Sequence, residues 1–159
     1  MTFQFDVKSG HRITSGVIVA DGRTRLKGGI ISPASSTAVH TVFATNVSTT
    51  GTYSQTSTTI TVTMANTLAV GDRVWLDFTS GNAVDAVYVI ASASATEFTV
   101  TAGSASTSGN VTLYAGILME VDTQAATPFS FMVPGDGILA ESGLYVGMPS
   151  VVSVTVFYG

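Results

Sequence analysis

The sequence predicts an all-β protein, built as a discontinuous β-sandwich that is interrupted by a small β-barrel-like module. Three observations lead to this fold class. Short runs of alternating apolar and polar residues recur along the 159 residues, and they are rich in β-branched and aromatic side chains. Gly, Pro, Asn and Asp separate the runs at short intervals, as they do at turns between strands. No run carries the 3.6-residue apolar stripe of an amphipathic helix.

The first part of the chain is predicted to form four strands. An Asp21-Gly22 pair is a strong tight-turn signal and closes the second strand, while Pro33 stops the third. The four runs are FQFDVKS (3–9), RITSGVIVADG (12–22), TRLKGGIIS (24–32) and TAVHTVFATNV (37–47).

Two stretches of small polar residues flank a separate series of short strands in the middle of the chain. They are residues 48–58 and 103–110, and their Ser, Thr and Gly content is typical of flexible spacers. The runs between them are TTITVTMA (58–65), NTLAVGDRVWLDF (66–78), DAVYVIASAS (85–94) and TEFTVTA (96–102). We therefore expect an inserted module at residues 53–103, with residues 1–52 and 104–159 forming the outer sandwich.

After the second spacer the longer apolar strands return. Their runs are VTLYAGILMEV (111–121), FSFMVPGDGILA (129–140), GLYVGM (143–148) and SVVSVTVFYG (150–159). The second and the fourth of these runs supply more apolar side chains than one small core needs. We therefore expect Phe129, Phe131, Phe157 and Tyr158 to contribute to an interface.

The stretch LAVGDRVWLDFTSGNAVDAV (68–87) raises the question of a catalytic pocket, because it holds three aspartates and the only Trp. Paired carboxylates act as acid and base only where they converge in an enclosed site. Here Asp72 follows Gly at a turn, Asp77 lies on the polar face of a strand, and Asp85 opens the next strand. Turns and strands are the favoured interpretation. Trp75, on the face of Asp77, is expected to pack under a loop or to contact a partner.

Other catalytic and metal-binding signals are weak. The chain has no cysteine, which excludes disulfides and thiol catalysis. His11 and His40 have no i, i+4 partner and no acidic cluster beside them in the sequence, although folding could still assemble a two-His site. The sequence has no P-loop, dinucleotide-binding fingerprint, serine nucleophile elbow or calcium loop. We expect no enzyme activity, no cofactor and no metal.

Charge is scarce, at 10% of residues, and the net charge is −4. Nucleic-acid affinity depends mainly on basic residues that bind the phosphate backbone, and the chain has six of them. Nucleic-acid binding is therefore disfavoured. Arg23, Arg25 and Lys27 alternate like one charged face of a strand, with a phosphate site as the less favoured alternative. No apolar run reaches the roughly 20 residues of a membrane span. No signal peptide is visible, so we expect a protein assembled in the cytoplasm and not at a membrane.

The middle of the chain carries a resemblance to a known group of proteins. Residues 56–102, TSTTITVTMANTLAVGDRVWLDFTSGNAVDAVYVIASASATEFTVTA, resemble a small β module seen repeatedly in virion proteins of tailed bacteriophages. The shared pattern is an alternating Thr strand, a Gly-Asp turn, an apolar strand, a Ser-Gly turn and a closing FTVTA. FDVKSG (5–10) and PGDGILAESGLYVGMPSVVSVTVFYG (134–159) are similar to short structural proteins of marine and cyanobacterial phages. The resemblance implies a virion component and brings no catalytic residues.

The expected function is that of a virion structural protein, most closely a capsid decoration or cement protein on the outer capsid surface. Its partners would be further copies of itself, with a trimer favoured at capsomer junctions, and the major capsid protein. The alternative is a tail, neck or fibre component that could bind a host surface or carbohydrate. Exposure of Trp75 and Tyr88 would favour this alternative. The expected interface residues are Trp75, Phe129, Phe131, Phe157 and Tyr158.

Overall fold

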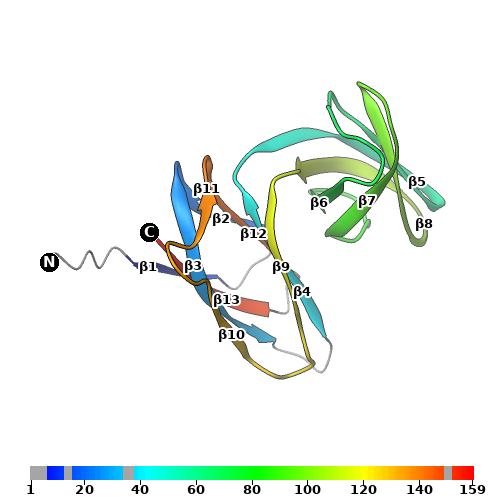
Figure 1. Cartoon of the computed structure of the whole chain (residues 1–159). Coiled ribbons are helices and arrows are strands. Elements are labelled where there is room, and N and C mark those ends of the chain that lie inside the picture. Colours follow the sequence, from blue (N-terminus) through cyan, green and yellow to red (C-terminus); the bar gives the residue numbers. More distant parts are fainter. Residues whose placement is uncertain (1–6, 13–15, 34–37, 149–151) are drawn as a thin grey trace, which may run out of the picture. The chain divides into compact units, whose positions relative to one another are not determined.

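The computed structural model describes residues 7–12, 16–33, 38–148 and 152–159. Within these ranges the protein consists of strands β1 to β13 without a helix, so the all-β prediction is confirmed (Figure 1). Residues 3–6 of the first expected strand lie outside the described ranges. The strands are β1 (Lys8–Arg12), β2 (Val17–Asp21), β3 (Thr24–Pro33), β4 (Val39–Thr45), β5 (Ser48–Thr63), β6 (Arg73–Asp77), β7 (Ala86–Ala93), β8 (Glu97–Tyr114), β9 (Ile117–Thr123), β10 (Phe129–Met132), β11 (Ile138–Ala140), β12 (Gly143–Gly147) and β13 (Val152–Tyr158).

The chain divides into two compact units. Unit 1 joins Met1–Asn46 to Leu118–Gly159, and unit 2 is Val47–Ile117. The unit that interrupts the other therefore begins and ends further out than the expected 53–103. The reason lies in the two stretches that composition marked as spacers, because both belong to strands of unit 2.

Unit 1 contains two antiparallel sheets. Sheet A has the strand order β1-β13-β3-β10, with β11 also paired to β3, and sheet B has the order β2-β12-β4-β9. Alternate residues of both sheets point into one apolar core, as the period of two in a strand requires. Sheet A contributes Leu26, Ile31, Val152, Val154 and Val156, and sheet B contributes Val19, Val39, Phe43, Leu144 and Val146. Two sheets on one core form a sandwich.

Unit 2 is built on a long antiparallel ribbon of β5 and β8. Their pairing runs from Ser48 opposite Tyr114 to Thr63 opposite Glu97, with one irregularity between Ser57 and Thr59. β8 also pairs with β6 near one end and with β7 near the other, while β6 and β7 pair with each other. This unit has a core of its own, made by Tyr53, Ile60, Val62, Met64, Val74, Leu76, Tyr88, Ile90, Phe98, Val100, Val111 and Leu113. The barrel-like description of this module stays a prediction.

The two expected spacers are corrected by this ribbon. Residues 48–58 belong to β5 and residues 103–110 belong to β8, and Gln55 lies directly opposite Thr107. Ser and Thr in these stretches serve as the exposed positions of strands, while Tyr53 and Gln55 at alternate positions are buried. The expected long strand 111–121 is also corrected, because β8 ends at Tyr114 and β9 begins at Ile117.

Candidate functional site

Two of the three aspartates of residues 68–87, Asp72 and Asp85, hold local structure through side-chain hydrogen bonds. The Oδ2 of Asp72 accepts a 2.8 Å hydrogen bond from the Ala69 amide, which closes the turn before β6. The Oδ1 of Asp85 accepts a 2.7 Å bond from the Phe78 amide and so fixes the loop between β6 and β7. The turn role predicted for Asp72 is confirmed, whereas the loop contact of Asp85 was not predicted.

The pKa of the Asp85 carboxyl is raised above its ordinary value. Burial raises that pKa above 3.8, the bond from Phe78 opposes the rise, and the negative charge of Asp77 adds to it. Tyr88 lies nearby, and burial, followed by the charge of Asp85, raises the pKa of its phenol above 10.0. The Tyr88 hydroxyl donates a 2.7 Å bond to the Val84 carbonyl. These groups hold the loop in place, because both hydrogen bonds end on backbone atoms.

The same loop is also fastened to the β5–β8 ribbon. The Tyr53 hydroxyl donates to the Ser80 carbonyl at 3.2 Å and accepts from the Ala83 amide at 3.3 Å. The Ser80 hydroxyl accepts from the Asn110 amide at 2.8 Å. The Tyr53 ring meets Phe78 edge-to-face at 4.6 Å between centroids. The hydroxyl groups of Tyr53 and Ser80 therefore hold this loop in position.

Trp75 is buried, with 1% of its surface exposed. The expectation of a solvated strand face is therefore wrong at this position, because the side chain is enclosed by the protein itself. Tyr88, at 8%, is buried as well. An exposed aromatic pair at these positions, which would have favoured sugar binding, is not present.

The fold brings His40 to two carboxylates that lie far from it in the sequence. Its Nδ1 lies 2.5 Å from the Oδ1 of Asp122, and its Nε2 lies 3.3 Å from the Oε2 of Glu120 without hydrogen-bond geometry. β4 and β9 are neighbours in sheet B, which explains the meeting. The carboxylates face different ring nitrogens, so the three groups do not converge on one point. Among the described residues no group of three His, Asp or Glu could hold a metal ion.

His11 has a different partner, which lies in sheet A. Its Nδ1 pairs with the Thr155 hydroxyl at 2.9 Å across β1 and β13. The two-His site that folding might have assembled is not formed. His40 and its carboxylates could have been found only from the register of sheet B, which the sequence does not encode locally.

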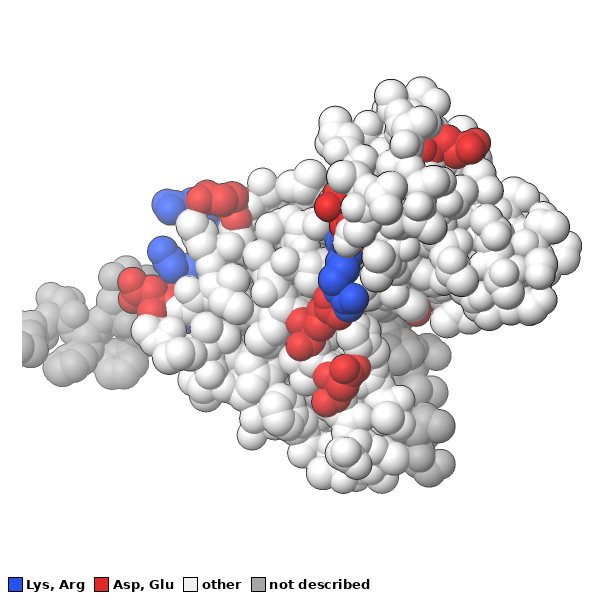
Figure 2. Space-filling view, turned by 45° about the vertical axis from the view of Figure 1, so that its right-hand side comes forward, with Lys and Arg blue, Asp and Glu red and all other residues white. Residues whose placement is uncertain are grey.

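Acceptors of unit 1 engage the basic residues at the start of β3, where Arg23 precedes the strand and Arg25 and Lys27 belong to it. Arg23 lies 3.1 Å from the Glu141 carboxylate, Arg25 donates to the Gly137 carbonyl, and Lys27 donates to the Asp136 carbonyl at 2.6 Å. The contacts of Arg25 and Lys27 fasten the turn between β10 and β11 onto β3. Figure 2 shows that charged side chains are few on the face drawn and that most of its surface carries no charge.

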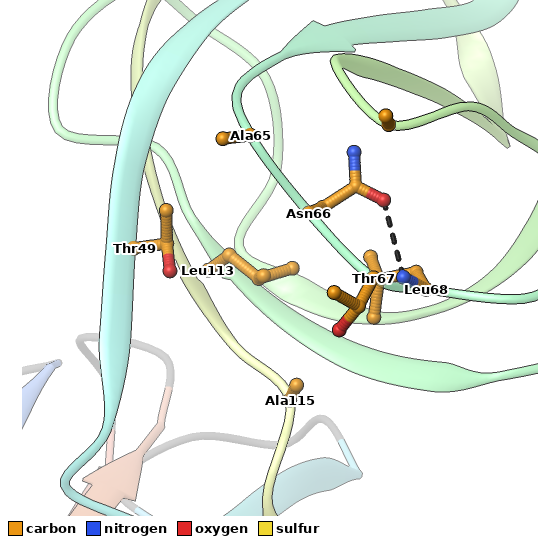
Figure 3. Close-up of a pocket in the computed structure, with 8 residues that line it drawn as sticks. Thr49, Ala65, Asn66, Thr67, Leu68, Leu113 and Ala115 are labelled. Atoms are coloured by element: carbon orange, nitrogen blue, oxygen red, sulfur yellow. Dashed lines mark hydrogen bonds between the residues drawn. The ribbon is translucent and has the colours of Figure 1, made fainter.

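A hollow of about 390 Å³ lies in unit 2 (Figure 3). Its lining is mostly apolar or small and comes from Thr49, Ala65, Asn66, Thr67, Leu68, Ala95, Leu113 and Ala115. The Asn66 amide is occupied by its own loop, since Nδ2 donates to the Met64 carbonyl and Oδ1 accepts from the Leu68 amide. The hollow offers no titratable side chain, so it is a poor candidate for a catalytic site.

The four expected interface residues of the sandwich lie on β10 and β13, on either side of β3. Phe129 is 43% exposed, and its ring stacks on Phe131 at 6.3 Å between centroids. Phe131 is half-buried and meets Phe43 of the core edge-to-face at 5.5 Å. Phe157 and Tyr158 are half-buried, and Tyr158 packs against the core. Only Phe129 of this set is strongly exposed.

Two further exposed apolar residues lie on the outer face of sheet A, and sequence reasoning missed both. Met132 is 74% exposed and Ile30 is 39% exposed. Cross-strand pairing places Gly28 of β3 between Phe157 and Met132, and places Ile30 between Thr155 and Ser130. Because opposite residues share a face, Phe157, Ile30 and Met132 lie together on the outer face of sheet A. Strict alternation along FSFM was the signal that could have identified Met132.

Comparisons with protein-family models, with curated proteins and with solved structures find no match for this chain. Within the described ranges, no helix has the length and hydropathy needed to cross a bilayer.

Proposed function

We propose that the protein is a structural subunit of a bacteriophage virion that decorates the outer surface of the capsid as a homo-oligomer. The observation that carries the proposal is the set of exposed apolar side chains of sheet A: Ile30 and Met132 on its outer face are 39% and 74% exposed, and Phe129 on the opposite face of edge strand β10 is 43% exposed. Exposed apolar side chains gathered on one sheet are typical of protein contacts. The sequence resemblance to phage virion modules supplies the context in which such contacts would form.

The internal hydrogen bonds of the protein are consistent with this role. Polar side chains in the loop of unit 2 and the basic residues of β3 make internal contacts that hold turns in place. Side chains used in this way stabilise a rigid subunit, which is what a capsid needs on its surface. The expected trimer and the major capsid protein as partner stay predictions within this proposal.

The test is binding to capsids from which this protein has been removed. We expect the purified protein to rebind these capsids to saturation and to raise their resistance to heat or low salt. A matched variant, Met132→Lys, should rebind more weakly if the apolar surface of sheet A takes part. If the protein ignores such capsids and binds purified tail or neck proteins, the decoration assignment is wrong and the tail, neck or fibre alternative replaces it.

A further inference from the structure

We infer that β10 is a docking strand for a second copy of this chain, which adds to sheet A edge-to-edge across a two-fold axis. The inference deepens the proposed function, because it names the contact through which the subunit would self-associate. It starts from the open edges of the sandwich. An edge strand presents unpaired backbone N–H and C=O groups, and proteins protect such edges with charge or with proline.

Three of the four sandwich edges carry charged residues. β1, at one end of sheet A, has Lys8 and Arg12, and the two end strands of sheet B have Asp21 in β2 and the pair Glu120 and Asp122 in β9. These charges discourage pairing with another strand.

β10, at the other end of sheet A, is different. Its residues, Phe129–Met132, carry no charge, and within the described part of the chain its one strand partner is β3. Its neighbour on that side of β3 is β11, which is followed at once by Glu141. Phe129, Ser130 and Met132 are exposed. β10 is therefore the uncharged, apolar and accessible edge of the sandwich.

The backbone of β10 shows which groups are free to pair. The Val133 amide donates to the Lys27 carbonyl at 2.9 Å, and the Phe131 carbonyl faces Gly28 so closely that a side chain there would meet it. Residues 131 and 133 thus direct their backbone groups toward β3. Because these directions alternate along a strand, Ser130 and Met132 direct their N–H and C=O toward the open edge.

This pattern is self-complementary. With a two-fold axis at Phe131, antiparallel pairing sets Ser130 opposite Met132 of the second copy, and each such pair can exchange both of its backbone hydrogen bonds. On the core-side face, Phe131 then lies opposite Phe131 of the second copy and Phe129 lies opposite Val133. Aromatic and apolar cross-strand pairs stabilise a sheet. No charged side chain of β10 is brought against its own copy.

A two-fold contact closes on itself, so it produces a dimer or an even-numbered assembly. This differs from the trimer that capsid geometry favoured. The difference makes the oligomeric state of the full chain a direct test.

The first experiment is sedimentation equilibrium of the full chain and of two lysine variants. Met132→Lys places a charge at the open edge of β10, and Ile18→Lys is the matched control, because Ile18 is also exposed, at 46%, on edge strand β2. We expect a wild-type dimer, at least about tenfold weaker association for Met132→Lys, and no change for Ile18→Lys. Circular dichroism and urea unfolding check that both variants fold. A trimer unaffected by Met132→Lys, or a wild-type monomer, would overturn the inference.

The second experiment tests the register and does not depend on a destabilising charge. The chain has no cysteine, so in the double variant Ser130→Cys/Met132→Cys a thiol reagent can link only introduced residues. Directly opposite Cβ atoms lie about 4.5–5.5 Å apart in such a pair, more than the roughly 3.5–4.5 Å of a disulfide, so we expect a short bifunctional thiol cross-linker to yield a covalent dimer. Ile18→Cys is the control and should stay monomeric on a non-reducing gel. Failure of the double variant to cross-link, when the wild type is dimeric, would overturn the β10 contact.

The inference and the proposed function can fail separately. A dimer broken by Met132→Lys that ignores stripped capsids would keep the docking strand and remove the decoration role. A monomer that rebinds stripped capsids would keep the decoration role and remove the docking strand.

Discussion

The Nδ1 of His40 lies 2.5 Å from the Oδ1 of Asp122, although 82 residues separate them in the sequence. The contact joins β4 to β9 at the edge of sheet B. Asp122 is 83% exposed at its side chain and His40 is 34% exposed, so water weakens the attraction between them.

The first prediction is that this pair stabilises the edge of sheet B modestly. Asp122→Asn and His40→Gln should each lower the free energy of unfolding by about 0.2–1 kcal/mol, the range measured for exposed ion pairs. The double variant should lose less than the sum, because the two residues share one contact. Urea unfolding of the four proteins gives the coupling energy. Strict additivity would mean that the contact contributes nothing.

The second prediction concerns Asp85, whose folded-state pKa is raised by burial above 3.8. A carboxyl with a raised pKa binds its proton more tightly in the folded protein than in the unfolded one. The free energy of unfolding therefore falls as pH rises from 3.8 through the raised pKa, and the loss persists at neutral pH. Asp85→Asn should remove this pH dependence, and it should leave stability at pH 7 unchanged or slightly higher.

A control separates the charge of Asp85 from its hydrogen bond. Asn can still accept from the Phe78 amide, whereas Asp85→Ala leaves that amide without the acceptor it has in the wild type. We expect Asp85→Ala to cost about 1–3 kcal/mol. Unfolding followed between pH 3 and pH 7 checks both variants. Equal losses for Asn and Ala at pH 7 would show that the carboxylate charge itself stabilises the loop.

The third prediction uses two glycines of unit 2 that both have positive φ. Gly81 (φ 82°) lies in the loop fastened by Tyr53, where an added Cβ would collide with the Tyr53 hydroxyl and the Ser108 carbonyl. Gly71 (φ 95°) lies at the turn before β6, and a Cβ there would meet no atom within 4 Å. Gly71→Ala should cost about 1–2 kcal/mol for the backbone conformation alone. Gly81→Ala should cost clearly more, by thermal unfolding, and equal costs would mean that the loop yields easily.

The all-β class, the alternation of core residues and the turn role of Asp72 could be predicted from the sequence, because each depends on neighbours within a few residues. Residues 48–58 could not be assigned, since a Ser- and Thr-rich composition is shared by linkers and by exposed ribbons. Only the pairing of Gln55 with Thr107 distinguishes the two. The assignment of residues 48–58 to a strand therefore depends on long-range strand register.

The candidate sites were less predictable for the same reason. Alternation places Trp75 on the face of β6 that does not carry Val74 and Leu76. Its burial depends on tertiary packing, which no local sequence pattern predicts. His40 meets Asp122 only because β4 lies beside β9. The exposure of Met132 follows from its place on the outer face of an edge strand, and edge position is a property of the whole sheet.

The last prediction is that unit 1 folds without unit 2. Ser48 and Tyr114 are directly paired at the start of the β5–β8 ribbon, so the chain leaves unit 1 and returns to it at nearby points. Replacing residues 47–117 by a short Gly-Ser linker between Asn46 and Leu118 should therefore cost little loop entropy. Unit 1 keeps its core of sheets A and B in such a chain.

We expect this shortened chain to unfold in one cooperative urea transition, with a smaller m-value than the full chain because less surface is buried. Deletion of residues 53–103 is the informative control. It removes most of the β5–β8 pairing and leaves residues 48–52 and 104–114 without the rest of their module. The 53–103 deletion should therefore be less stable than the 47–117 deletion. A non-cooperative transition for the 47–117 deletion would show that the sandwich depends on the inserted unit for its stability, and the division into two folding units would then be wrong.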